Sequence, residues 1–337
     1  MSLIDLLGMR VAVIQAPMAG TSTPALAAAV SEAGGLGCLG LGAMRADEAA
    51  AAMAETRALT ARPFGVNLFC HRPESSDPAR EAAWLARLAP HFHRFGATPP
   101  VALRDIYPSF TRNDAMLAAV VAAAPALVSL HFGLPRPDQI AALRATGAVL
   151  AATATSPAEA EAIRAAGLDA VIAQGWEAGG HRGIFDPSGP DARLGTLDLV
   201  AALVPLGLPV IAAGGIMDRR DSRAALAAGA VAVQCGTAFL AAPEAATPAA
   251  HRAALAGGET VMTAAISGRP ARCCANRFTA IPDDATPGYP MTYDAGKALN
   301  AAALAAGETG YGAQWAGTGC ARTVARPAAE TLAALAP

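Results

Sequence analysis

The residues best suited to chemistry follow short apolar runs, at the points where strands are expected to end. These places carry glycines, side-chain amides and imidazoles. They are Gln15–Gly20 (QAPMAG), Asn67, His131, Gln174–Gly183 (QGWEAGGHRG), Gly214-Gly215 and Gln234–Thr237 (QCGT). Because the carboxyl ends of parallel strands meet at one edge of a sheet or barrel, the sequence predicts that these groups share one site.

His181 is the strongest candidate for an acid–base catalyst. It lies in a glycine-rich loop just after the apolar run Ala170–Ala173. A neutral imidazole titrates close to working pH, which suits a base that removes a proton. A structural role is the alternative for any lone histidine, and for His131 the two readings are evenly balanced. The remaining histidines fall in insertions or helices and are expected on the surface: His71, His91, His93 and His251.

Two glycine-bearing strand ends are typical of a phosphate site. Glycine lets backbone N–H groups approach a phosphate closely, and a short helix starting near Thr237 would direct its positive end to the same place. In (β/α)₈ barrels the phosphate pocket is formed after strands seven and eight. Gly214-Gly215 alone could be only a tight turn. Together with Gln234–Thr237 one unit later, it predicts phosphate binding.

A third glycine pattern does not predict a nucleotide site. Gly35–Gly40 matches G-x-G-x-x-G, but the dinucleotide fingerprint must follow a strand and open a helix. Here the pattern follows a predicted helix and spans a predicted strand, so we do not assign it a nucleotide.

The elements that position these groups alternate strictly between strand and helix. Helices are predicted at Pro24–Ala33, capped by Thr23 and ended by Gly34, at Asp47–Leu59, and from Ser156. The predicted strands are Val11–Ala16, Leu36–Leu39, Phe64–Leu68, Val128–Leu130, Val149–Ala152, Ala170–Ala173, Val210–Ala213 and Ala230–Gln234. Eight such units favour a closed (β/α)₈ TIM barrel of class α/β over an open doubly wound sheet.

Two segments exceed what a barrel needs. An insertion after strand three, residues 70–113, carries its own helix around Trp84. Residues 257–337 follow the eighth unit. We therefore predict a cofactor-binding barrel over residues 1–256 with its insertion, and a lid-like C-terminal subdomain on the substrate side over residues 257–337.

Composition narrows the function further. Of 337 residues, 53% are hydrophobic and only 15% charged, which excludes a disordered chain. The net charge of −2, without a basic stripe, argues against a nucleic-acid partner. The six cysteines lack zinc-type pairing and indicate a reducing compartment. The sequence shows no signal peptide and no membrane span, so we expect a cytoplasmic protein, monomeric or weakly dimeric.

These residues make the chain resemble the nitronate monooxygenases, also called 2-nitropropane dioxygenases, over nearly its whole length. The matching segments are QAPMAG, FGVNLF with Asn67, SLHFGLP from Ser129, QGxEAGGH from Gln174, AGGI from Ala213 and QxGT from Gln234. A late segment, Tyr289–Lys297 (YPMTYDAGK), is similar to the class I branch. It contains the only lysine in the chain, Lys297.

The resemblance implies a set of roles for individual residues. His181 would be the catalytic base facing a bound FMN, and the substrate would meet His131, Tyr289, Tyr293 and Lys297, with Lys297 attracting an anionic nitro group. The residues implied for FMN binding are Ala16, Pro17, Met18, Asn67, Gln174, Gly179, Gly180, Gly214, Gly215, Gln234, Cys235, Gly236 and Thr237.

The activity implied by the resemblance is oxidation of alkyl nitronates, such as propionate 3-nitronate, by O₂ to a carbonyl compound and nitrite. Related flavoproteins share the barrel and its GGH loop, and fold does not fix function. The alternative is therefore an NAD(P)H-dependent flavin reductase acting on quinones or enoyl thioesters. A flavin-binding protein without turnover is a third reading, against which the full set of polar residues argues.

Overall fold

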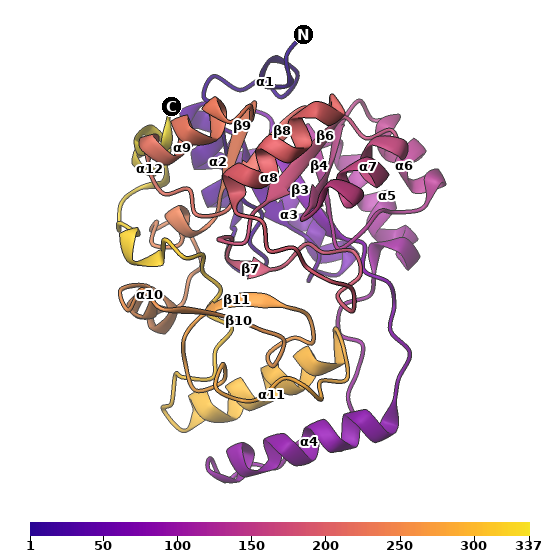
Figure 1. The fold of residues 1–337 in the computed structure, drawn as a ribbon, viewed down its shortest axis with the longest axis vertical. Helices are drawn as coiled ribbons and strands as arrows, with labels where there is room; N and C mark the ends of the chain where they lie inside the picture. Colours follow the sequence, from indigo (N-terminus) through magenta and orange to yellow (C-terminus); the bar gives the residue numbers. More distant parts are fainter.

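The computed structural model describes residues 1–337, and a barrel of eight parallel strands forms its centre (Figure 1). The neighbour order is β1-β9-β8-β6-β5-β4-β3-β2, and an Ile14–Leu36 bridge joins the two ends. This confirms the predicted α/β barrel. The strands are β1 (Val13–Gln15), β2 (Gly37–Gly40), β3 (Phe64–Phe69), β4 (Leu127–His131), β5 (Val149–Ala154), β6 (Ala170–Gln174), β8 (Val210–Ala213) and β9 (Ala232–Cys235).

The outer helices begin and end where local chemistry dictates. Thr23 accepts a hydrogen bond from the Leu26 N–H, and Gly34 ends that helix at φ 104°, as predicted. Ser156 caps a later helix through the Glu159 N–H. The ring consists of α2 (Pro24–Ala33), α3 (Ala46–Leu59), α5 (Asp114–Ala123), α6 (Pro137–Arg144), α7 (Pro157–Ala165), α8 (Thr196–Leu203) and α9 (Arg219–Ala227). Short 3₁₀ turns are η1 (Phe110–Arg112), η2 (Val204–Leu206), η3 (Thr237–Phe239) and η4 (Cys320–Arg322).

Two apolar layers stabilise the barrel. One cluster of 45 buried residues lies between the strands and the outer helices. A second, smaller cluster fills the barrel interior, with side chains such as Ile14, Leu127 and Ile172, and the N-terminal helix α1 (Leu3–Leu6) closes it by burying Leu3. The amino end of the barrel is thus sealed, which leaves the carboxyl end for ligands.

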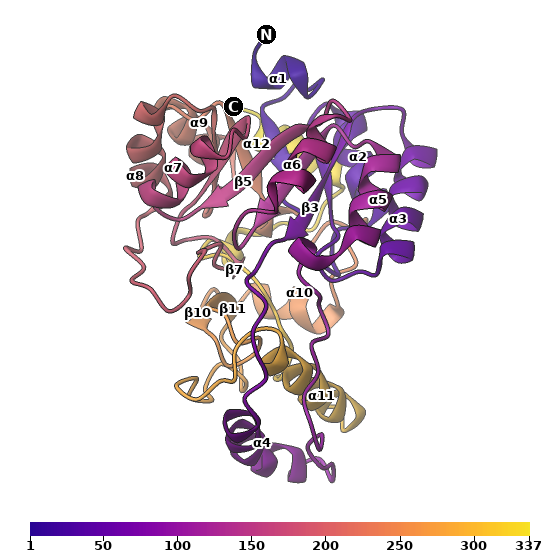
Figure 2. The same cartoon turned by 90° about the vertical axis from the view of Figure 1, so that its right-hand side faces the viewer.

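A second body lies below the barrel in Figures 1 and 2 and combines two distant parts of the chain. Trp84, Leu88 and Phe92 of the insertion pack with Leu299 and Phe278 of the C-terminal region. Its elements are α4 (Pro78–His93), α10 (Ala249–Leu255), β10 (Thr260–Thr263), β11 (Ala271–Cys274) and α11 (Met291–Ala305). Strand β7 (Gly180–His181) pairs antiparallel with β11, so the loop that carries His181 belongs to both bodies.

The last helix does not stay with this second body. Helix α12 (Ala328–Leu335) returns to the barrel, where it packs against α2 and α9, close to the C-terminus in Figure 1. Residues 257–337 therefore contribute to both bodies: α11 faces the cavity, whereas α12 belongs to the outer layer of the barrel.

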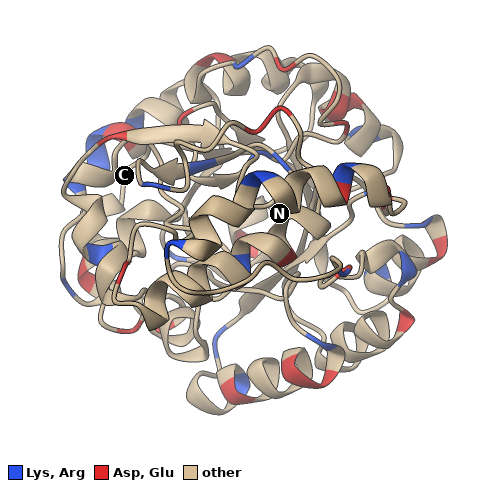
Figure 3. Cartoon of the chain, turned by 90° about the horizontal axis from the view of Figure 1, so that it is seen from below, with Lys and Arg blue, Asp and Glu red and all other residues tan.

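On the face that carries α4 and α11, charged residues of one sign do not gather together (Figure 3). Seen from the side of α4 and α11, basic and acidic segments are scattered among one another (Figure 3). None of the helices combines the length and the apolar character that crossing a bilayer requires.

Candidate active site

A single cavity of about 640 Å³ lies between the carboxyl ends of the strands and the second body. Every residue named from the sequence as catalytic, cofactor-binding or substrate-binding lines it. The residues that follow barrel strands converge because parallel strands bring their carboxyl ends to one rim, whereas Tyr289, Tyr293 and Lys297 come from α11 and the residues just before it. The volume is in the range of cofactor and substrate pockets.

The two glycine-bearing strand ends form a backbone cradle. Gly214 and Gly215 adopt φ values of 123° and 69°, which disfavour any residue with a Cβ atom. The N–H groups of Gly214, Gly215 and Gly236 donate to no protein atom, and Gln234 Oε1 is buried without a partner. This cradle has donors and an acceptor for a ligand. The predicted helix at Thr237 is only the three-residue turn η3, so individual N–H groups matter more here than a helix dipole.

The loop after β1 is held by a buried amide. Gln15 accepts a hydrogen bond from the Cys38 N–H at 3.0 Å and donates to Ser22 Oγ at 2.8 Å, and Ser22 accepts in turn from the Met18 N–H at 2.8 Å. Gln15 therefore positions the Ala16–Met18 backbone toward the cavity.

The side-chain amides of Asn67 and Gln174 differ in which hydrogen-bonding atoms remain free for a ligand. Asn67 donates from Nδ2 to the Ser129 carbonyl and hydroxyl at 3.1 and 2.9 Å, and its Oδ1 accepts no bond within the protein. Gln174 donates from Nε2 to the His181 carbonyl at 2.9 Å and accepts from the Gly183 N–H at 2.7 Å. The Gln174 side chain therefore holds the His181 loop, and only one of its amide hydrogens remains for a ligand.

Hydrogen bonds define the tautomer of His181. Its Nε2 lies 2.9 Å from Ser267 Oγ, and Ser267 donates its only hydroxyl hydrogen to the Arg269 carbonyl at 3.2 Å. With the Ser267 hydrogen directed to that carbonyl, Nε2 carries the proton that Ser267 accepts, and the Nδ1 lone pair is free to take a proton. Sequence reasoning missed Ser267, because it is one of many serines until the fold brings it to His181.

Burial keeps His181 neutral. Desolvation, with smaller contributions from neighbouring His131, Arg269 and His71, lowers its pKa to about 3. The imidazole is thus deprotonated throughout the physiological range, although its basicity is weak. An anion formed in the cavity would stabilise the imidazolium and raise that pKa.

His131 forms a hydrogen bond with the backbone of His181. Its Nε2 lies 3.2 Å from the His181 carbonyl, and its Nδ1 lies 3.0 Å from Thr153 Oγ1. Because a carbonyl only accepts, Nε2 carries the proton and Nδ1 accepts from the threonine. Burial lowers the pKa of His131 to about 4. The ring lines the cavity, but both nitrogens are engaged by the protein.

An aromatic enclosure surrounds the His181 ring. The ring centroids of Trp315, Phe132, Tyr289 and Tyr293 lie 5.1, 5.5, 5.7 and 6.1 Å from that of His181. Burial raises the pKa of both tyrosines, so both stay protonated donors. Tyr289 OH is buried with no partner. Trp315 was not anticipated, because no strand or motif precedes it in the sequence.

Lys297, at the rim of the cavity, is hydrogen-bonded to a tyrosine of the insertion. Lys297 Nζ donates to Tyr107 OH at 2.8 Å, and the Tyr107 ring lies 5.6 Å from that of Tyr293. Tyr107 also lines the cavity, and the sequence analysis did not identify it. It lies in an irregular stretch, so only the packing of the insertion on α11 reveals it.

Two histidines expected on the surface are buried. His71 is 1% exposed and packs edge-on against Tyr289, and His251 is 6% exposed and lies 3.1 Å from the Trp315 carbonyl through Nε2. The expectation was wrong because the second body folds over both positions. His93 is exposed, and His91 is half-buried with Nδ1 2.9 Å from Tyr311 OH.

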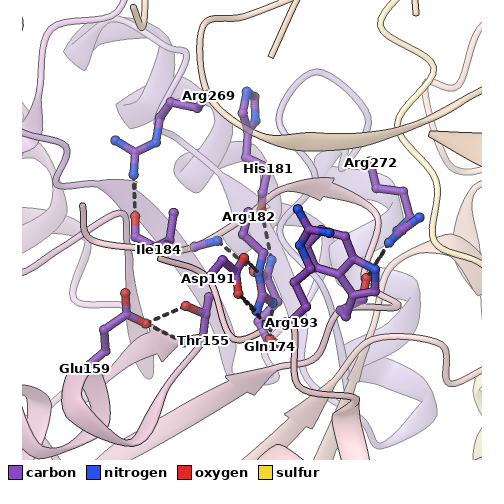
Figure 4. A network of polar contacts seen from close by, with 12 residues as sticks. Thr155, Glu159, Gln174, His181, Arg182, Ile184, Asp191, Arg193, Arg269 and Arg272 are labelled. Atoms are coloured by element: carbon purple, nitrogen blue, oxygen red, sulfur yellow. Dashed lines mark hydrogen bonds and ion pairs between the residues drawn. The ribbon is translucent and has the colours of Figure 1, made fainter. Parts of the chain in front are cut away.

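A buried network fixes the loop around His181 (Figure 4). The Arg182 side chain is 1% exposed and forms a two-pronged ion pair with Asp191 at 2.8 and 3.0 Å. It also donates to the Gln174 carbonyl. On the other side, Arg269 donates to the Ile184 carbonyl and lies over the Phe132 ring at 4.4 Å. These bonds pin the residues that follow His181, so the loop is preorganised.

Comparison with known proteins agrees with this geometry. Residues 1–336 match the family described as nitronate monooxygenase. A nitronate monooxygenase from Paraburkholderia phytofirmans is 56% identical, covering 99% of this chain and 93% of the relative. The nitroalkane oxidase of Streptomyces ansochromogenes superposes with a TM-score of 0.92 at 41% identity, over 99% and 96% of the two chains. FabK from Thermotoga maritima is more distant, with a TM-score of 0.73 at 29% identity over 99% and 94%.

Proposed function

Since the chain belongs to the nitronate monooxygenase family of flavin-dependent oxidoreductases, we propose that it binds FMN and uses O₂ to oxidise alkyl nitronates, such as propionate 3-nitronate, to a carbonyl compound and nitrite. The observation that carries the proposal is the composition of one cavity. A glycine cradle lies on one side of it, and His181, Tyr289, Tyr293 and Lys297 lie on the other.

The residues of the cradle fit FMN. Free N–H groups at Gly214, Gly215 and Gly236 suit a terminal phosphate, and the unpartnered Gln234 Oε1 suits a hydroxyl donor of a ribityl chain. The free Oδ1 of Asn67 suits an N–H of the flavin ring, and the Ala16–Met18 backbone, held by Gln15, would contact the ring. Bound FMN would supply electron transfer between the nitronate and O₂.

Charge and hydrogen bonding favour an anionic substrate. Lys297 is the one cation among the residues that line the cavity, and its hydrogen bond to Tyr107 directs it. Tyr289 and Tyr293 stay protonated and could donate to nitro oxygens. A nitronate carries its negative charge on those oxygens, so it would be held by one ammonium and phenolic donors at the rim.

His181 would act only when the substrate arrives as a neutral nitroalkane. Its Nδ1 would remove the proton on the carbon next to the nitro group, while Nε2–H stays bonded to Ser267. A nitronate is already deprotonated and bypasses this step. In net balance, two nitronate anions and one O₂ give two carbonyl compounds and two nitrite ions. Each nitronate loses two electrons, formally at nitrogen, and the four electrons reduce O₂, whose two atoms become the two carbonyl oxygens.

The deciding experiment is an anaerobic titration of the flavin bound to the purified protein. The proposal expects bleaching by ethyl nitronate and none by NADH or NADPH, with nitrite released once O₂ is admitted. Rapid bleaching by NADH, and reoxidation by a quinone or an enoyl thioester, would establish the reductase alternative instead. Mass spectrometry of the cofactor released by heat tests FMN directly, and FAD as the sole species would contradict it.

A further inference from the structure

The cavity extends well past the groups assigned to the reaction. Helix α11 lines it with Tyr293, Gly296, Lys297, Asn300 and Leu304. These positions share one helical face, spaced by three or four residues. At 1.5 Å per residue, Asn300 lies about 10 Å and Leu304 about 16 Å along the axis from Tyr293. On α11 the groups assigned to the substrate are Tyr293 and Lys297, so the two turns from Lys297 to Leu304 have no role in the proposed reaction.

The extension is walled by elements of the second body. Opposite α11 lies the segment Gly312–Trp315, and the first turn of α10 contributes Ala250 and His251. Leu304, at the far end, is 52% exposed, so the extension reaches solvent there. We call this space the α11 chamber, bounded by Asn300, Leu304, Gly312–Trp315 and Ala250–His251.

The chamber carries no charge. Beyond Lys297 its lining side chains are apolar or neutral and polar, and burial lowers the pKa of His251 to about 4, which keeps that ring neutral. A charged tail would therefore lose its hydration without gaining a counter-ion. The chamber suits an uncharged chain.

The Asn300 side chain in the chamber has no hydrogen-bond partner. The Asn300 carboxamide makes no hydrogen bond within the protein, and its Oδ1 is buried and unpartnered. An amide that lines a cavity can turn to present either its oxygen or its NH₂. An unpaired buried polar group costs free energy that a ligand would recover. Asn300 therefore predicts a hydrogen-bonding group on the tail, one helical turn beyond Lys297 and about 10 Å along α11 from Tyr293.

From these observations we propose that the α11 chamber is a subsite for nitronates with a long, uncharged tail that bears an amide or hydroxyl able to reach Asn300. The rise of about 10 Å along α11 from Tyr293 to Asn300 equals roughly three extended peptide units, or about nine chain atoms. The proposal rests on the proposed function and narrows its substrate class from small nitronates to functionalised long-chain ones.

The chain offers a residue that can fill the chamber without disturbing the backbone. A Cβ atom on Gly312 would meet Gln314 Cγ at 3.5 Å and Asn300 Oδ1 at 3.7 Å, which are ordinary contacts, and Gly312 is not in the left-handed region. Gly312→Leu should therefore fold and occupy the space beside Asn300. Gly312→Ala adds one methyl group and serves as the matched control.

The test compares kcat/KM for the nitronates of nitroethane, 1-nitrooctane and 8-nitrooctanamide. For the wild type we expect the amide-bearing nitronate to exceed ethyl nitronate at least tenfold. Gly312→Leu should remove that preference and leave ethyl nitronate within about twofold, whereas Gly312→Ala should retain it. Asn300→Leu should weaken the amide-bearing substrate but not the octyl one. No preference in the wild type, or equal losses on short and long substrates in Gly312→Leu, would overturn the subsite.

A binding measurement separates this proposal from the proposed function. Octanamide cannot be oxidised as a nitronate, and its binding can be followed by the shift in flavin absorbance. We expect it to bind the wild type and to bind Gly312→Leu at least tenfold more weakly. If ethyl nitronate is not oxidised at all, the proposed function fails while the octanamide titration still decides the chamber. Equal octanamide affinity in both proteins would contradict the subsite proposal and leave the proposed function untouched.

Discussion

The two sides of the cavity are built in opposite ways. The cradle side uses backbone N–H groups of Gly214, Gly215 and Gly236, each directly after a barrel strand. The other side uses side chains of Tyr107, Tyr293 and other residues, which come from an insertion and a C-terminal helix that meet only in the folded chain. The residues of the cofactor site can thus be recognised from short sequence motifs, whereas the substrate site depends on contacts between distant segments.

Because of this difference, we expect a change on the substrate side to affect turnover of the neutral nitroalkane and of its nitronate unequally, and to leave FMN binding intact. His181→Asn should lower turnover of neutral nitroalkanes by about 10² or more, the usual range for losing a general base. Turnover of the corresponding nitronate should fall far less, because no proton must be removed. Paired kinetics on both substrate forms, with the FMN content of each preparation, measure this. Equal losses on both forms would show that His181 positions the substrate, and loss of FMN would show a structural role.

A change near the cradle should instead weaken binding of the cofactor itself. A Cβ atom on Gly179 would lie 2.4 Å from the backbone of Ala316 and Gly317, which cannot move freely because the Gly317 N–H is bonded to Thr237 Oγ1 at 2.9 Å. Gly179→Val should weaken FMN binding by roughly tenfold or more, a value of about 1.4 kcal/mol. Fluorescence titration of the apoprotein with FMN measures the effect. Gly189→Ala, where the added Cβ meets nothing closer than 3.4 Å, is the control, and full FMN affinity in Gly179→Val would contradict a role for Gly179 in FMN binding.

The substrate side should also make the fold sensitive to acid. His71 and His251 each have a pKa lowered to about 4 by burial, against an ordinary 6.5. Between these values the unfolded chain binds protons that the folded chain excludes. The free energy of unfolding should therefore be unaffected by these rings above about pH 6.5 and fall toward pH 4, by about 1.4 kcal/mol per pH unit for each. Urea unfolding at several pH values should show His71→Phe and His251→Phe each reducing that slope. An unchanged slope would mean the rings are solvated.

The smallest effect is expected at the exposed rim. Lys297→Met removes an exposed charge, so KM for a nitronate should rise only about fivefold, consistent with roughly 1 kcal/mol for an exposed ion pair. Tyr107→Phe removes the hydrogen bond that directs Lys297, and KM should rise about twofold with kcat nearly constant. Steady-state kinetics at low and high salt distinguish the two, since only the charge effect is screened. A large fall in kcat for Tyr107→Phe would place it in the chemistry.

The sequence alone was sufficient for the barrel and for the positions at its rim. Strand runs such as Phe64–Phe69 and the capped helix Pro24–Ala33 are set by neighbouring residues, and glycines next to a strand end need no distant partner to be recognised. The (β/α)₈ order then brings all strand ends together, so the sequence is enough to group Asn67, Gln174 and His181. The family followed from the same local segments.

Tertiary structure alone decided what those residues touch. His71 and His251 were expected on the surface, but the insertion and the C-terminal region fold over them. Tyr107, Ser267 and Trp315 enter the site from segments without periodic pattern, and nothing near them in sequence announces a role. The tautomer of His181 depends on Ser267, 86 residues away. Burial, hydrogen-bond partners and pKa arise from contacts between distant segments, so local residue patterns cannot encode them, whereas strand ends and turns arise from neighbours along the chain.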